Sequence, residues 1–173
     1  YGYLKDLDKI KSAIENVDKH HPLSLTIISN SENRYKEVMG SWNIKTYYLK
    51  WSWVNFIQAM QLHEIAVLPF NFSPWTEGKS NNRMTLALSL GLSVVADPIE
   101  SYREFENACF LDNWEIGIRS YIENPLLQEQ HLREGDKIIQ ENYTIKKISD
   151  RWNYIFRQQE KVSFEGHIPK RKR

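Results

Sequence analysis

The chain has 173 residues, of which 41% are hydrophobic and 26% charged, as is usual for a soluble globular domain. Its single cysteine, Cys109, excludes a disulfide-stabilised scaffold, and no apolar run reaches the roughly 18–20 residues that span a bilayer. We therefore expect a cytoplasmic protein in which Cys109 is buried and reduced.

The charge is uneven along the chain. Residues 157–173 hold six Lys or Arg against two Asp or Glu, a net charge of +4, whereas the rest of the chain carries −3. Because the chain outside this basic segment is slightly acidic, its charge gives no general reason to expect nucleic acid as a partner. We predict that 159–173 is a basic, flexible tail. Weak attraction to the inner face of a membrane, or to RNA, is the alternative.

Helical and strand patterns alternate along the chain. In chain order, the sequence predicts a helix at 6–19, a strand at 23–29, a helix at 31–41, a strand at 44–51, a helix at 53–62, a strand at 64–69, a helix at 80–90, a strand at 92–97, a helix at 99–106, a strand at 108–111, a helix at 114–124, and only helices thereafter. The nearly continuous apolar run at 64–69 is typical of a strand buried on both faces.

This alternation predicts the α/β class, with a Rossmann-like, doubly wound parallel sheet and helices on both faces, over residues 1–158. Such a sheet normally opens with a strand that leads into a glycine turn. Tyr1-Gly2-Tyr3 falls where that turn would be. We therefore expect a first strand before Tyr1, and a sequence that is part of a longer protein.

The loop PFNFSPWTEGKSNNR at 69–83 is the strongest candidate for a binding site. Ligands of open parallel sheets bind beyond the carboxyl ends of the strands, and the start of the following helix attracts anions through its free N–H groups. The loop offers Lys79 and Arg83 as cations for a diphosphate, Ser80 as the helix cap, Asn81 and Asn82 as donors to phosphate or sugar hydroxyls, and Glu77 as an acceptor from a hydroxyl. An ordinary capped helix with exposed charges is the alternative.

The run from EIAVLP through KSNNRMTLALSLGLSVVADPIESYREF resembles the C-terminal, donor-binding half of the group 1 (GT4-like) GT-B glycosyltransferases. The matching pieces are Pro69, the loop 70–79, the helix from Ser80, Gly91 and the strand at 93–96. The resemblance covers about residues 1–158. It implies a hexosyltransferase-like enzyme of bacterial polysaccharide biosynthesis that binds a nucleoside-diphosphate sugar without a metal or cofactor.

The resemblance also implies a partner domain and further site residues. An N-terminal domain of the same enzyme would bind the acceptor, so the chain alone would be inactive, and its catalytic residues are not assigned. Trp51 would stack on the base beside Ser52, Asn30 would line the same crevice, and Gly2 would let the backbone approach the phosphates. Packing in the core is an equal alternative for Trp51 and the preferred interpretation for Trp53.

One departure from the family keeps two alternatives open. The family often carries two glutamates across this loop and helix. The positions that correspond here hold Leu86 and, next to Glu77, Gly78. Leu86 cannot accept a hydrogen bond from ribose, so a non-catalytic nucleotide- or protein-binding module of the same fold is the runner-up. A flavodoxin-like regulator is the third hypothesis.

Overall fold

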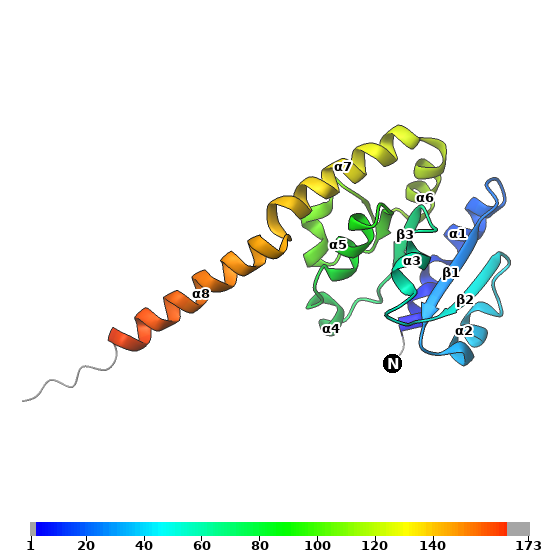
Figure 1. The fold of residues 1–173 in the computed structure, drawn as a ribbon. Helices are drawn as coiled ribbons and strands as arrows, with labels where there is room; N and C mark the ends of the chain where they lie inside the picture. Colours follow the sequence, from blue (N-terminus) through cyan, green and yellow to red (C-terminus); the bar gives the residue numbers. More distant parts are fainter. Residues whose placement is uncertain (1–2, 166–173) are drawn as a thin grey trace, which may run out of the picture. The chain divides into compact units, whose positions relative to one another are not determined.

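A computed structural model describes residues 3–165 of the chain (Figure 1). The chain separates into two compact units, Tyr1–Asp136 and Lys137–Arg173. The boundary expected at residue 158 lies inside the last helix. The first unit is a mixed α/β structure, so the predicted fold class is confirmed at that level.

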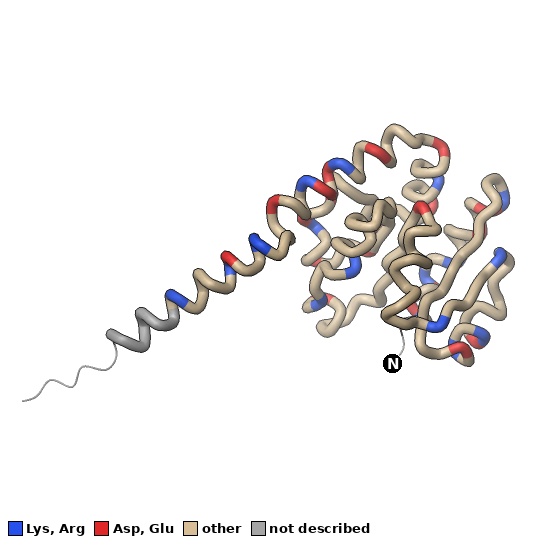
Figure 2. Tube along the Cα trace, in the orientation of Figure 1, with Lys and Arg blue, Asp and Glu red and all other residues tan. Residues whose placement is uncertain are grey.

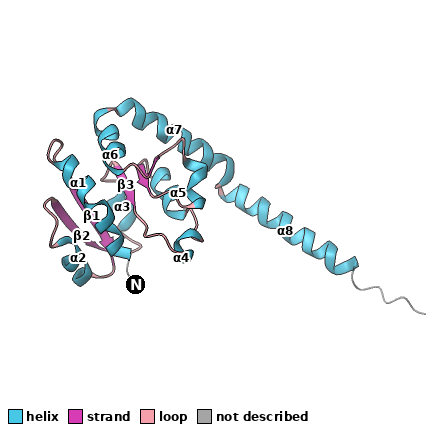
Figure 3. Ribbon diagram, turned by 180° about the vertical axis from the view of Figure 1, so that it is seen from behind, coloured by secondary structure: helices cyan, strands magenta, loops and turns pink. Residues whose placement is uncertain are grey.

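Five parallel-paired strands form two small sheets in the described part of the chain. β1 (Ser24–Ser29) pairs with β2 (Lys45–Lys50). β3 (Ile65–Leu68), β4 (Ser93–Ala96) and β5 (Phe110–Leu111) form the second sheet in that order. β1 and β2 lie side by side, and β3 lies apart from them (Figures 1 and 3). The five strands occur where predicted, but the described residues do not join them into one sheet.

The helices also follow the predicted order. They are η1 (Tyr3–Ile10), α1 (Lys11–Asp18), α2 (Glu32–Met39), α3 (Phe56–Met60), α4 (Pro74–Glu77), α5 (Asn82–Ser89), η2 (Glu100–Phe105), α6 (Trp114–Glu123), α7 (Pro125–Asn142) and α8 (Ile145–Glu165). The single helix expected at 6–19 is a 3₁₀ segment followed by an α-helix. The short helix α4 was not predicted.

The η1–α1 segment packs on strands of both sheets. Its apolar side chains, including Ile10 and Ile14, share one buried cluster with Ile27 of β1, Val95 of β4 and Ile118 of α6. Burying such a side chain contributes about 1.5–3 kcal/mol. This helical segment is therefore the common support of the two sheets. Helix α5 also packs on β3 and β4.

A glycine ends α5 as the sequence predicts. Gly91 has φ of +81°, a left-handed conformation that disfavours residues with a Cβ atom. The N–H of Leu92 donates to the carbonyl of Ala87, and that of Gly91 to the carbonyl of Leu88, both at 3.0 Å. These two bonds form a Schellman motif. The motif places Ser93 at the start of β4.

Cys109 lies buried just before β5, as expected. Its Sγ donates to the carbonyl oxygen of Phe105 at 3.2 Å. Burial raises the pKa of the Cys109 thiol to about 12. The side chain therefore behaves as a small apolar residue of the core.

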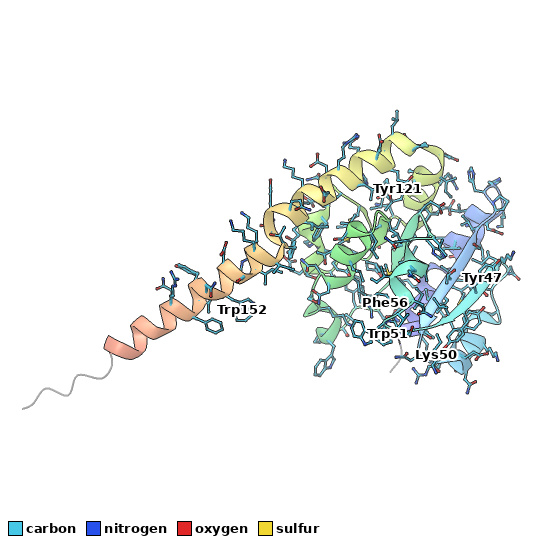
Figure 4. The ribbon with its side chains drawn as sticks, in the orientation of Figure 1. Tyr47, Lys50, Trp51, Phe56, Tyr121 and Trp152 are labelled. Atoms are coloured by element: carbon cyan, nitrogen blue, oxygen red, sulfur yellow. The ribbon has the colours of Figure 1, made fainter. Side chains whose placement is uncertain are left out.

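The second unit contains the end of α7 and the long helix α8. Thr144 caps α8 as predicted, because its Oγ1 accepts a hydrogen bond from the N–H of Lys147 at 3.3 Å. The ring of Trp152, labelled in Figure 4, stacks at 5.7 Å on that of Phe156, and both side chains are exposed. Among residues 3–165, no helix has both the length and the apolar content needed to cross a bilayer.

Candidate functional site

The candidate site lies at the carboxyl ends of β3 and β4. The chain leaves β3 through Pro69 and Phe70, passes through α4 and enters α5 (Figure 1). The N–H of Asp97, which follows β4, donates to the carbonyl of Leu68 at the end of β3, at 3.3 Å. The two strand ends are thereby fixed next to each other, at the edge of the sheet where ligands of this fold class bind.

Phe70 is the buried centre of this region. Its side chain is 1% exposed and its ring packs edge-on against Tyr102, with centroids 5.8 Å apart. Lys79 Nζ lies 5.4 Å and Arg83 Cζ 5.8 Å from the Phe70 centroid. Both distances are within the range of a cation–π contact. The structure therefore brings together the two cations that the sequence proposes for a diphosphate, over a single aromatic ring.

Asp97 and Lys9 belong to this site, although neither is predicted from the sequence. Asp97 is fully buried, forms an ion pair with Lys9, and accepts a hydrogen bond from the N–H of Phe70 at 2.7 Å. Lys9 Nζ also lies 5.0 Å from the centroid of the Phe72 ring. An acidic residue at the end of the apolar strand predicted at 92–97 was the available signal for Asp97. No local signal identifies Lys9, because it reaches the site from η1.

Asp6 is a second buried carboxyl group at the site. Asn71 Nδ2 donates to Asp6 Oδ1 at 2.5 Å. Burial raises the pKa of Asp6, whereas the hydrogen bonds from Asn71 and the charges of Lys79 and Arg83 oppose this rise. The carboxyl group of Asp6 therefore lies within electrostatic reach of both proposed phosphate-binding cations.

The start of α5 differs from the prediction in its cap. The helix begins at Asn82, and the cap position is held by Asn81, not by Ser80. The side chain of Asn81 does not cap the helix, because its Nδ2 donates to Glu104 Oε1 at 2.6 Å. Asn81 thus ties α5 to η2. The first N–H groups of α5 have no partner within the helix, as at any helix start.

The remaining predicted residues lie outside this cluster. Glu77 is exposed at the end of α4. Asn30, Trp51 and Ser52 follow β1 and β2, the strands of the other sheet, and Asn30 is exposed. Gly2 is outside the described residues.

An aromatic cluster surrounds Trp51. Its ring lies 4.8 Å from that of Trp53 and 5.9 Å from that of Phe56 (Figure 4). Ser52 Oγ donates to Asn55 Oδ1 at 2.6 Å. Trp53 is 79% exposed, so the expectation that it packs in the core is wrong. Its ring instead packs edge-on against the rings of Trp51 and Phe56 at the surface.

The charges of the cluster favour an anion of moderate charge. It combines three cations (Lys9, Lys79 and Arg83) with two carboxyl groups (Asp6 and Asp97). Elsewhere on the described chain both signs are interspersed (Figure 2). Among the described residues, no group of three or more His, Cys, Asp or Glu side chains is arranged to hold a metal ion.

Comparison with known proteins gives no family assignment. No model of a known protein family matches the chain, and no curated protein sequence matches it significantly. The function is therefore argued from the site alone.

Proposed function

We propose that the chain is the donor-binding domain of a GT-B glycosyltransferase. It would bind a nucleoside-diphosphate sugar at the carboxyl ends of β3 and β4, in a doubly wound α/β fold. One observation carries this proposal: Lys79 and Arg83 lie over the Phe70 ring at the start of α5. Two cations and a helix N-terminus at one point suit a diphosphate.

In the proposed reaction, the sugar leaves the donor and a nucleoside diphosphate is released. Negative charge develops on the diphosphate as the bond to the sugar breaks. Lys79, Arg83 and the dipole of α5 would stabilise that charge, because they are already in place before the reaction. The acceptor, and a base if the reaction uses one, would be held by another domain.

Asp6 and Asp97 would have different roles in this proposal. Asp97 would hold Lys9 and the backbone of Phe70, the ring that the two proposed phosphate ligands contact. Asp6 lies close enough to Lys79 and Arg83 to interact with their charges. Burial already raises its pKa, so a nearby phosphate would favour the protonated form further.

Calorimetric titration of UDP, GDP and their sugars into the chain tests the proposal. We expect micromolar-to-millimolar affinity, and a loss of about 10- to 100-fold in Lys79→Ala and in Arg83→Ala, since a hydrogen bond to a charged group contributes about 1.5–3 kcal/mol. Arg133→Ala is the matched control, because Arg133 pairs with Glu129 on the exposed side of α7. Absence of binding at millimolar nucleotide, or full affinity in both variants, would refute the proposal.

The runner-up is a non-catalytic binding module, and Leu86 is the observation that favours it. This residue lies half-buried on α5, at a position where the family often carries a ribose-binding glutamate. Inorganic pyrophosphate separates a donor site from a module that no longer recognises the base and ribose of a nucleotide. If UDP binds at least tenfold more tightly than pyrophosphate, the base and ribose are recognised, as a donor site requires. Equal affinities favour the module.

A further inference from the structure

Asp6 is a buried carboxyl group beside the candidate site. The residue is only 6% exposed. Both the side-chain amide and the backbone N–H of Asn71 donate hydrogen bonds to it, the side-chain amide at 2.5 Å. Asn71 follows Pro69 and Phe70 in the loop that leaves β3. These bonds therefore hold the carboxyl group at the carboxyl end of β3, where the loop toward Lys79 begins.

Two cations face this carboxyl group. The charged side chains with the largest effect on Asp6 are Lys79 and Arg83. The other two charged groups of the cluster, Lys9 and Asp97, form an ion pair with each other. Helices α1 and α2, which pack on η1, carry further charged residues outside the cluster: Lys11, Glu15, Asp18, Glu32, Arg34, Lys36 and Glu37. The balance at Asp6 is therefore two cations against one carboxylate.

An ionised Asp6 opposes the ligand that the site is proposed to bind. The diphosphate of a nucleoside-diphosphate sugar carries two negative charges. Lys79 and Arg83 would hold it within electrostatic reach of the carboxyl group. A carboxylate there repels the phosphates, and burial weakens the screening of that repulsion by water. A neutral carboxyl group leaves two cations for the two negative charges.

Protonation also changes the hydrogen bonds that this carboxyl group can form. A carboxylate only accepts hydrogen bonds, whereas a protonated carboxyl group has one O–H donor and keeps an acceptor oxygen. The acceptor oxygen can retain the bond from Asn71. The O–H group is then a donor for a phosphate oxygen, and a hydrogen bond to a charged acceptor is stronger than a neutral one. One proton thus turns Asp6 from a repelling group into a donor.

We propose that Asp6 takes up one proton from the solvent when a nucleoside-diphosphate sugar binds to Lys79 and Arg83. In the bound state its carboxyl group is neutral and donates to the diphosphate. The inference rests on the proposed donor binding and adds to it the protonation state of the site. Asp6 is thereby the residue that makes the affinity for the donor depend on pH.

The direction of this pH dependence follows from the same contacts. In the free chain, burial raises the pKa of Asp6, whereas the charges of Lys79 and Arg83 lower it. A bound diphosphate offsets those two charges, so the pKa of Asp6 rises on binding. The affinity is then highest below the pKa of the free chain and constant above the pKa of the bound chain. Between the two pKa values it falls by up to about tenfold per pH unit.

Calorimetric titration at several pH values between about 5 and 8 measures the proton uptake. The probe is the UDP- or GDP-sugar that the chain binds, because its diphosphate is esterified at both ends and does not titrate in this range. Each titration is repeated in two buffers that differ in their enthalpy of ionisation, neither of them phosphate. The difference in heat gives the protons taken up. We expect up to one proton per bound ligand, and an affinity that falls at least about threefold as the pH rises.

Asp6→Asn and Asp8→Asn are matched substitutions on η1. Asparagine at position 6 has nearly the same shape as aspartate, keeps an acceptor for Asn71 and cannot take up a proton. We expect Asp6→Asn to lose the proton uptake and to bind about three- to tenfold more tightly than the unchanged chain at pH 8. Asp8 is exposed, so Asp8→Asn, the same change of charge, should retain the uptake and the pH dependence.

The ¹³C resonance of the Asp6 carboxyl carbon is a second readout, which needs no substitution in the chain that is titrated. It should move to the position of a protonated carboxyl group as ligand is added. Binding without proton uptake, or equal uptake in Asp6→Asn, would overturn the inference and leave the proposed function intact. Weaker binding of Asp6→Asn at every pH would show that the ionised carboxylate accepts from a ligand hydroxyl instead. Absence of binding in all three chains would refute the proposed function and this inference with it.

Discussion

Asp97 holds three segments of the chain together through one carboxylate. It lies directly after β4, accepts the N–H of Phe70 from the loop after β3, and pairs with Lys9 of η1. A buried carboxylate is tolerated only where such partners compensate for lost hydration. Its position therefore links the stability of the first unit to the geometry of the proposed site.

Replacing this carboxylate should destabilise the fold. Asp97→Ala leaves the N–H of Phe70 buried without its acceptor and Lys9 without its partner. We expect the free energy of unfolding in urea to fall by about 2–3 kcal/mol, at the low end for a broken buried pair because Lys9 is partly exposed. Asp8→Ala, at an exposed position of η1, should change it by less than about 0.5 kcal/mol. A similarly small effect at Asp97 would contradict this role.

At the scale of residues, the sequence predicted only the local part of the candidate site. Lys79 lies in the loop just before α5 and Arg83 in the first turn of α5, so the two are close in the sequence. Asp6 and Lys9 reach Asn71 and Asp97 across 65 and 88 positions of the chain. Contacts of that kind depend on how the elements pack, which a single sequence does not encode locally.

At the scale of elements, strands and most helices lie close to their predicted ranges because their boundaries carry local signals. Gly91 ends α5 through its left-handed conformation, and Thr144 caps α8. The short helix α4, which was not predicted, also has a local signal. Ser73 accepts from the N–H of Thr76 in a capping box, and Pro74 occupies the first turn.

Gly117 gives a test of how closely α6 packs on the second sheet. A Cβ atom at this position would lie 2.8 Å from Phe110 Cβ and 3.1 Å from Val95 Cγ2. Gly117→Ala should therefore lower stability by about 1–3 kcal/mol through overpacking, although alanine favours a helix by about 1 kcal/mol. The measurement is thermal unfolding of the full chain.

Gly135→Ala on α7 is the matched control for this prediction. The three atoms nearest to its Cβ would all belong to the Leu88 side chain, with the two Cδ atoms at 3.1 Å and Cγ at 3.4 Å. That side chain can rotate away, so the helix preference of alanine should offset most of the cost. A melting temperature that falls equally in both variants would show that α6 is not packed more tightly than α7.

At the scale of the whole molecule, the sequence predicted the α/β class but not the division into two sheets. The order of strands and helices follows from periodicity, which is local. Among the described strands, β1 pairs only with β2 and β3 only with β4, and the residues of β3 are half-buried. Which strands pair depends on contacts between distant parts of the chain, which the local pattern does not encode.

The lone cysteine can report how often the folded chain opens. In the folded chain Cys109 is buried, and burial raises the pKa of its thiol to about 12. In an unfolded chain the pKa of a cysteine thiol is about 8.5, close to the pH at which disulfide exchange is measured. At pH 8 the reagent should therefore capture Cys109 only when the chain opens, at a rate set by the open population. Asp97→Ala should speed the reaction by about 30- to 150-fold if opening is global. An unchanged reaction rate in Asp97→Ala would mean that the segment around β5 opens locally, without global unfolding.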